Sequence, residues 1–152
     1  MGTDCHRAIA APIEALEREA AALTEAAQRY FGPGGRVDRE RLQPMQRIAY
    51  SCESLALSTR LLHISTWLMN CRAYVAGEMD GVRLRLPEGP LYREEAIAIL
   101  PAKARQLIIA SIDLHDRVRR LDRAFDRDEA ADADLIAAGP ARRLIERLHQ
   151  AF

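Results

Sequence analysis

One uninterrupted stretch, from Pro44 to Ala76, most constrains how this chain folds. It has about 33 residues and no internal glycine or proline, so it predicts one helix of roughly 50 Å. Two apolar seams run along it in alternating steps of four and three residues. The first seam contains Ile48, Cys52, Leu55, Thr59, Leu62, Thr66, Met69 and Ala73, and the second contains Leu57, Leu61, Ile64, Leu68, Cys71 and Val75.

The two seams lie on nearly opposite sides of the predicted helix, which turns by about 100° per residue. Such a helix must be covered on both sides by other helices. Because one chain offers only two further long helices, we expect a homodimer formed through one seam, although one chain could also cover both. The candidate dimer or bundle positions are Leu55, Leu57, Leu61, Leu62, Ile64, Leu68 and Met69. The sequence leaves open which seam forms the dimer.

Two other segments have helical periodicity and are separated by glycine and proline. A first helix is expected from Pro12 to Tyr30, and a third from near Tyr92 to about Phe125, with Pro101 bending or restarting it. The segment from Gly77 to Pro90 is expected to be an ordered loop. We therefore predict an all-α fold, an antiparallel three-helix bundle over residues 1–125 with long second and third helices.

The end of the chain, residues 126–152, has a different character. An acidic spacer of small residues precedes a glycine and a proline, and a short amphipathic segment follows. Its apolar positions are Leu144, Ile145, Leu148 and Phe152. A helix this short needs a surface to lie on, so we expect a mobile or weakly docked tail that either covers the bundle or tethers a partner.

The composition narrows the class of partner. Lys and Arg total 22 and Asp and Glu total 22, which removes the simplest electrostatic case for binding nucleic acid or an acidic membrane. No apolar run has the length of a membrane span, and the N-terminus lacks a signal pattern. Three cysteines without paired spacing fit reduced thiols. These features predict a cytoplasmic protein.

No motif of known enzymes, cofactor sites or metal sites stands out. The sequence has no Gly-rich phosphate loop, no paired Cys-x-x-Cys and no His-Glu-x-x-His. Glu146 and His149 have the spacing of a carboxylate-bridged metal site, but such a site needs a second copy and two more glutamates. We therefore predict no enzyme activity, no cofactor and no metal.

Polar residues on the long helix are the best functional clue. Glu53, Arg60 and Trp67 recur every seven residues, and His63 lies one turn from Trp67. Arginine and tryptophan dominate interface hot spots, so these four residues are a candidate partner surface. The alternative is structural: Arg60 pairs with an acid on a neighbouring helix and Trp67 fills the space between helices. The spacing by itself fits both.

Several blocks of the sequence resemble one family. They are Glu53-Ser54, Ser58-Thr59-Arg60-Leu61-Leu62, Ser65-Thr66-Trp67-Leu68, Arg72-Ala73 and Gly77-Glu78-Met79, and further on Leu100-Pro101, Leu107-Ile108, Ser111, Leu114, Arg117-Val118 and Leu121-Asp122. Together they are similar to the alphaproteobacterial family typified by the regulator of CtrA degradation, over roughly residues 45–125.

The resemblance implies a fold, an assembly and a role. It implies a three-helix bundle that forms a homodimer, and a non-enzymatic adaptor that helps deliver a cell-cycle response regulator to the ClpXP protease. Its partners would be protease-pathway proteins or a client protein. The alternative from the residues is a ligand- or metal-binding helical bundle, favoured by Trp67 and by Glu146 with His149.

Overall fold

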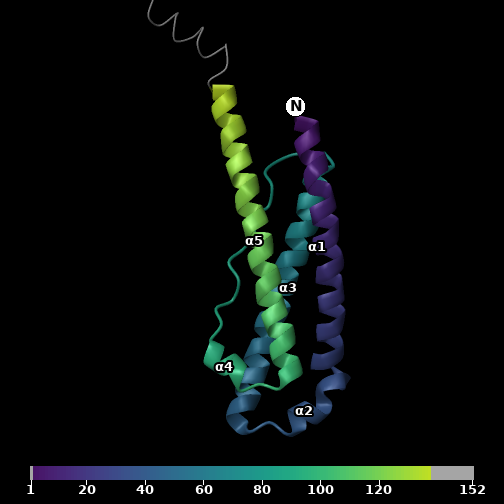
Figure 1. Cartoon of the computed structure of the whole chain (residues 1–152), viewed down its shortest axis with the longest axis vertical. Coiled ribbons are helices and arrows are strands. Elements are labelled where there is room, and N and C mark those ends of the chain that lie inside the picture. The colour runs from purple at the N-terminus through teal and green to yellow at the C-terminus, as the bar shows by residue number, and fades with distance from the viewer. Residues whose placement is uncertain (1, 138–152) are drawn as a thin grey trace, which may run out of the picture. The chain divides into compact units, whose positions relative to one another are not determined.

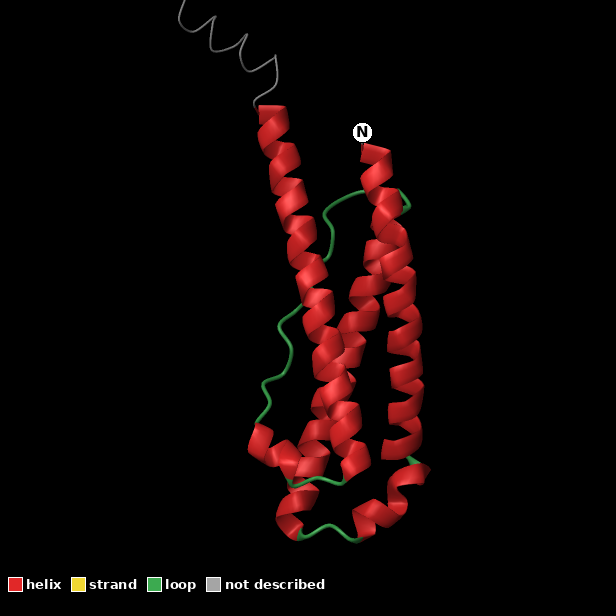
Figure 2. Cartoon of the chain, viewed as in Figure 1, coloured by secondary structure: helices red, strands yellow, loops and turns green. Residues whose placement is uncertain are grey.

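The computed structural model describes residues 2–137 of the chain. Every regular element in this range is helical (Figure 2), so the predicted all-α class is confirmed. The chain forms two compact units, Met1–Val118 and Arg119–Phe152. Their boundary falls inside the last helix, and the described part of the second unit, residues 119–137, is the second half of that helix. The predicted division after residue 125 stays a prediction.

The first helix, α1 (Gly2–Phe31), begins ahead of the predicted start at Pro12. Its buried positions include Ile13, Ala20 and Ala27, each seven residues from the next. The two alanines are small, so a neighbouring helix can approach closely along this face. The helix ends at Phe31, and an added Cβ at the next residue, Gly32, would lie 2.6 Å from the carbonyl oxygen of Gln28. Only glycine fits that close approach of the backbone.

The connector between the first two long helices is partly helical. It contains the 3-10 turn η1 (Pro33–Gly35) and the short helix α2 (Arg36–Glu40). Tyr30 fixes this corner because its hydroxyl donates a hydrogen bond of 2.7 Å to the Asp38 carboxylate. Burial and this neighbouring carboxylate raise the pKa of Tyr30 far above its usual value.

The long helix α3 (Pro44–Val75) matches the predicted helix closely. Pro44 occupies its first turn, and a capping box between Gln43 and Gln46 satisfies the orphan amides there. At the other end, Gly77 adopts a left-handed φ of 72°. The amide of Glu78 then donates to the carbonyl of Ala73 over 3.0 Å, which is the hydrogen bond of a Schellman cap.

The remaining helices are α4 (Glu94–Ala98) and α5 (Ala102–Ala137). Pro101 separates them, as its missing amide predicts. The third helix therefore restarts at proline as expected, but it does not end near Phe125: its helical structure continues to Ala137. The acidic segment after Phe125 also contains several alanines, which sustain a helix well. The boundary predicted from the acidic composition was therefore wrong.

The core of the first unit lies between α1, α3 and residues 102–118 of α5. Figure 1 shows α3 running alongside α1 in the opposite direction. On α5, Leu107, Ser111, Leu114 and Val118 are all buried. Arg117 of α5 forms an ion pair with Glu19 of α1.

Candidate interaction surface

One of the two seams of α3 is buried and the other is largely exposed. The second seam is the intrachain core, since Leu57, Leu61, Ile64 and Leu68 are at most 5% exposed. The first seam stays on the surface. Its large apolar side chains are Ile48, Leu55, Leu62 and Met69, which are 60%, 69%, 65% and 62% exposed. With Met45 and Cys52, which are also exposed, they form a row that we call the α3 stripe.

A groove lies next to this stripe, between α1 and α3. It encloses about 510 Å³ and is lined on α1 by residues that include Ala27 and Phe31, and on α3 by residues that include Leu57 and Leu61. Leu62 belongs to both the groove and the stripe. The two features are therefore continuous, and together they extend the apolar surface that α3 offers.

The predicted partner surface is mostly buried. Glu53, Arg60 and Trp67 are 7%, 2% and 0% exposed, which corrects their interpretation as an exposed surface. His63 is partly exposed, and its Nδ1 is buried without a hydrogen-bond partner. The physical reason is that Arg60 on this flank of α3 contacts α5 and the loop before α4. The acid that acts on Arg60 is Glu53 of the same helix, and not an acid of a neighbouring helix as the structural alternative supposed.

Arg60 makes three contacts inside the first unit. Its Nη1 donates to the hydroxyl of Ser111 on α5, and its Nη2 donates to the carbonyl of Pro90, both over 3.4 Å. Its guanidinium carbon lies 5.8 Å from the centroid of the Tyr92 ring, within the range of a cation–π interaction. One side chain of α3 therefore holds both α5 and the loop that precedes α4.

Burial controls the electrostatics of this cluster. Removal from water lowers the pKa of Arg60, while the charge of Glu53 opposes that change. Burial likewise raises the pKa of Glu53 above its usual 4.5, and Arg60 opposes the rise. Glu53 Oε2 has no hydrogen-bond partner in the structure. The two charges thus stabilise each other in a buried site, which is the condition under which losing one partner is costly.

Residues 77–93, which we call the strap, pack along α3 and α5 through polar anchors. The Leu84 amide donates to Asn70 Oδ1 over 2.8 Å. Nε2 of His115, on α5, lies 3.2 Å from the Pro87 carbonyl oxygen, and Gly89 lies so close to the same ring that an added Cβ would be 3.2 Å away. The predicted loop is therefore ordered by contacts from both long helices.

Sequence reasoning missed Asn70 and His115, which hold the strap. Neither belongs to a motif, and each binds a backbone group of the strap, Leu84 N–H or the Pro87 carbonyl, whose position a sequence does not give. The only local signal is the concentration of proline and glycine at Pro87, Gly89 and Pro90, which indicates that the backbone here must fit a neighbour.

Some expectations concern metals, membranes and the tail. Within residues 2–137, no group of three or more His, Cys, Asp or Glu side chains is placed to hold a metal ion. None of the helices in this range combines the length and the apolar character needed to cross a membrane. The predicted amphipathic positions Leu144, Ile145, Leu148 and Phe152, and the pair Glu146 and His149, lie outside the described residues.

Comparisons with known proteins agree with the predicted resemblance. The family model described as "Protein of unknown function (DUF1465)" matches residues 6–152. The crystal structure of RcdA from Caulobacter crescentus CB15 is similar, with a TM-score of 0.58 and 30% sequence identity over 74% of this chain and 88% of that chain. No curated protein matches this sequence. The matched residues and the similar helical structure show that this chain belongs to the RcdA-like DUF1465 family.

Proposed function

We propose that this chain is a non-enzymatic, cytoplasmic adaptor in regulated proteolysis that helps deliver a cell-cycle response regulator to the ClpXP protease. The observation that carries the proposal is the similarity to RcdA, at 30% identity over 74% of the chain. The blocks that resemble the family support it further, because they lie mainly on α3, the central helix of the first unit.

The adaptor acts as a homodimer in this proposal, and its three long helices form an antiparallel three-helix bundle. The α3 stripe supports dimerisation: four large apolar side chains at heptad spacing are each at least 60% exposed. Exposed rows of this kind are typical of protein interfaces, and a repeat of fours and threes suits a second helix that carries the same repeat. A second copy of α3 meets that requirement.

Reconstituted proteolysis tests the proposed role. Purified ClpXP is mixed with ATP and a cell-cycle response regulator of the native organism, and loss of the regulator is followed on gels with and without this chain. We expect faster degradation when the chain is present. The matched control is the Leu62→Arg variant, which alters the stripe and leaves the buried seam intact. A degradation rate unaffected by the wild-type chain, for every cell-cycle response regulator of the organism, would contradict the adaptor role.

A further inference from the structure

A basic hollow lies at the corner where α2 leads into α3. It encloses about 440 Å³, and the charged side chains that line it are three arginines, Arg36, Arg39 and Arg47, against one glutamate, Glu40. Arginine side chains carry only hydrogen-bond donors. A ligand that satisfies this lining must therefore bring acceptors and negative charge.

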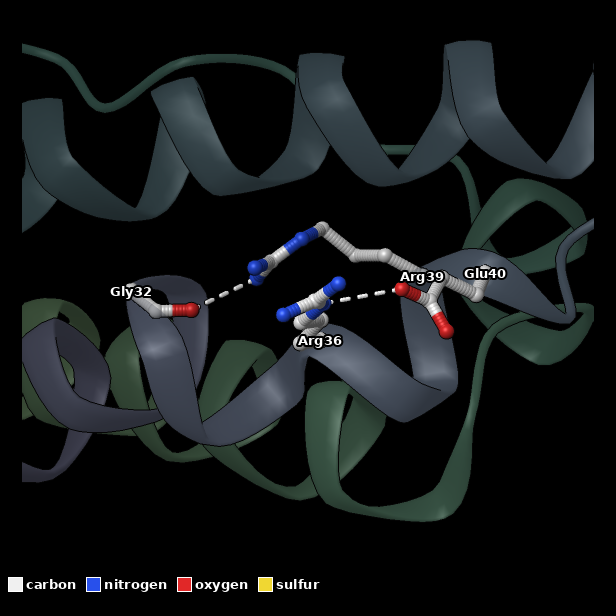
Figure 3. A network of polar contacts seen from close by, with 4 residues as sticks. All are labelled: Gly32, Arg36, Arg39 and Glu40. Carbon is white, nitrogen blue, oxygen red and sulfur yellow. Dashed lines mark hydrogen bonds and ion pairs between the residues drawn. The ribbon is translucent and has the colours of Figure 1, made fainter.

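Two of the arginines are held in place by backbone carbonyls. Nη1 of Arg39 donates to the carbonyl oxygens of Phe31 and Gly32 over 3.2 and 2.8 Å, at the end of α1. Figure 3 shows the bond to Gly32. Nε of Arg47 donates to the carbonyl oxygen of Leu42 over 3.1 Å. Each contact orients the side chain without an opposing formal charge, and it leaves other N–H groups of the same guanidinium for a ligand. Such pre-organisation lowers the entropy cost of binding.

The third arginine has an exchangeable partner. Nε of Arg36 lies 2.9 Å from Oε1 of Glu40, and the two side chains are 77% and 62% exposed. Figure 3 shows this pair next to Arg39, on the short helix α2. Exposed ion pairs of this kind contribute little free energy. A carboxylate from another molecule can therefore replace Glu40 at small cost.

The rest of the hollow is mainly apolar. Leu42 and Tyr50 line it and are 7% and 5% exposed. The Tyr50 hydroxyl is buried and has no hydrogen-bond partner in the structure, which is unusual for a buried polar group. Ser51, which is exposed and carries a hydroxyl group, also lines the hollow. An apolar wall next to fixed guanidinium groups suits a ligand with an anion and an apolar part side by side.

We propose that this hollow binds an acidic peptide segment of a partner protein. Carboxylates of the segment pair with Arg36, Arg39 and Arg47, in the two-pronged geometry that guanidinium and carboxylate share, and a neighbouring apolar side chain lies over Leu42 and Tyr50. A volume of about 440 Å³ belongs to the range of roughly 300 to 1,000 Å³ that holds whole ligands, far more than one phosphate group fills. The assignment of the segment to a partner protein rests on the proposed adaptor function. The expected binding of carboxylates to the three arginines does not rest on it.

The test uses the full chain and a defined probe. The probe is a fluorescein-labelled five-residue peptide in which glutamate alternates with leucine, and the matched peptide has glutamine in place of glutamate. Binding is followed by fluorescence anisotropy at low and physiological salt. The site variant combines Arg36→Gln with Arg47→Gln, and the control variant combines Arg18→Gln with Arg123→Gln, which removes the same charge from exposed positions outside the hollow. Circular dichroism melts show whether each variant folds.

We expect the glutamate peptide to bind the wild type and the control variant alike, and to bind the site variant at least about tenfold more weakly, a difference of about 1.4 kcal/mol. Binding should weaken with salt, and the glutamine peptide should bind weakly everywhere. Equal binding to site and control variants would overturn the proposal. So would inorganic phosphate that binds with the same arginine dependence while the glutamate peptide does not, because the site would then hold a small anion. Either result leaves the outcome of the proteolysis assay standing, so the two proposals fail separately.

Discussion

Arg60 of α3 and Ser111 of α5 are hydrogen bonded inside the protein although they are 51 positions apart in the sequence. The Ser111 hydroxyl accepts from Arg60 over 3.4 Å and donates to the carbonyl of Ile108 over 2.7 Å. Both residues are at most 2% exposed. A residue that sequence spacing suggested for a partner surface is therefore a buried connection between two helices.

Removing the charge of Arg60 should destabilise the fold strongly. In Arg60→Met the carboxylate of Glu53 loses its counter-charge while it stays buried, which costs about 3 to 5 kcal/mol. Urea denaturation at pH 8 measures the loss. The double variant Glu53→Gln with Arg60→Met should recover much of it, since no unpaired charge remains. A double variant as unstable as Arg60→Met alone would show that packing, and not charge, sets the cost.

Glu53 should make stability depend on pH in a specific direction. Burial raises its pKa above the usual 4.5, so between these two values the folded state binds more protons than the unfolded state. Its contribution to the free energy of unfolding therefore falls as the pH rises from about 4.5 through the raised pKa. The free energy of unfolding of the wild type minus that of Glu53→Gln, measured by urea melts at several pH values, should decrease over this window. A difference that grows with pH would contradict the assignment.

Trp67 should be essential for stability. It is 0% exposed, so Trp67→Ala should leave a cavity that costs about 3 to 5 kcal/mol. The matched control is Leu91→Ala, because Leu91 is 97% exposed and its loss should change stability by no more than about 0.5 kcal/mol. Thermal and urea melts of both variants provide the comparison. If Trp67→Ala melts like the wild type, the packing role is wrong.

Two neighbouring leucines should separate assembly from folding. Leu62 is 65% exposed on the α3 stripe and Leu61 is 5% exposed in the core. Leu62→Arg should yield a folded monomer, because it places a charge in the proposed dimer contact. Leu61→Arg should unfold the chain, because an unpaired buried charge costs several kcal/mol. Light scattering and circular dichroism measure the two outcomes, and a monomeric mass for the wild type at micromolar concentration would contradict the dimer.

Asn70 should control the order of the strap. Its side chain accepts from the Leu84 amide over 2.8 Å and donates to the sulfur of Met79 over 3.2 Å. Asn70→Ala removes both contacts, so the Leu84 amide should exchange with solvent faster while amides in the centre of α3 keep their protection. Hydrogen exchange with mass spectrometry shows this directly. Ser54→Ala, an alteration within α3 that touches only a local carbonyl, is the control.

The sequence determined the helices where local chemistry decides. Pro44, Gly77 and Pro101 set the ends of α3 and the start of α5, because a missing amide or a left-handed backbone acts within a few residues. The absence of glycine and proline within the stretch that follows Pro44 predicted the length of α3. Alternating steps of four and three identified both of its seams, and local blocks of residues identified the family.

Only the tertiary structure decided what each face of α3 contacts. Two seams with the same periodicity look equivalent in sequence, yet Leu61 is buried and Leu55 is exposed, because one position faces the helices of the same chain. The same reason placed Arg60 and Trp67 inside and brought Arg36 and Arg47 to one hollow. Burial and the meeting of distant residues depend on how helices pack, and packing is a property of the folded chain that no local pattern contains.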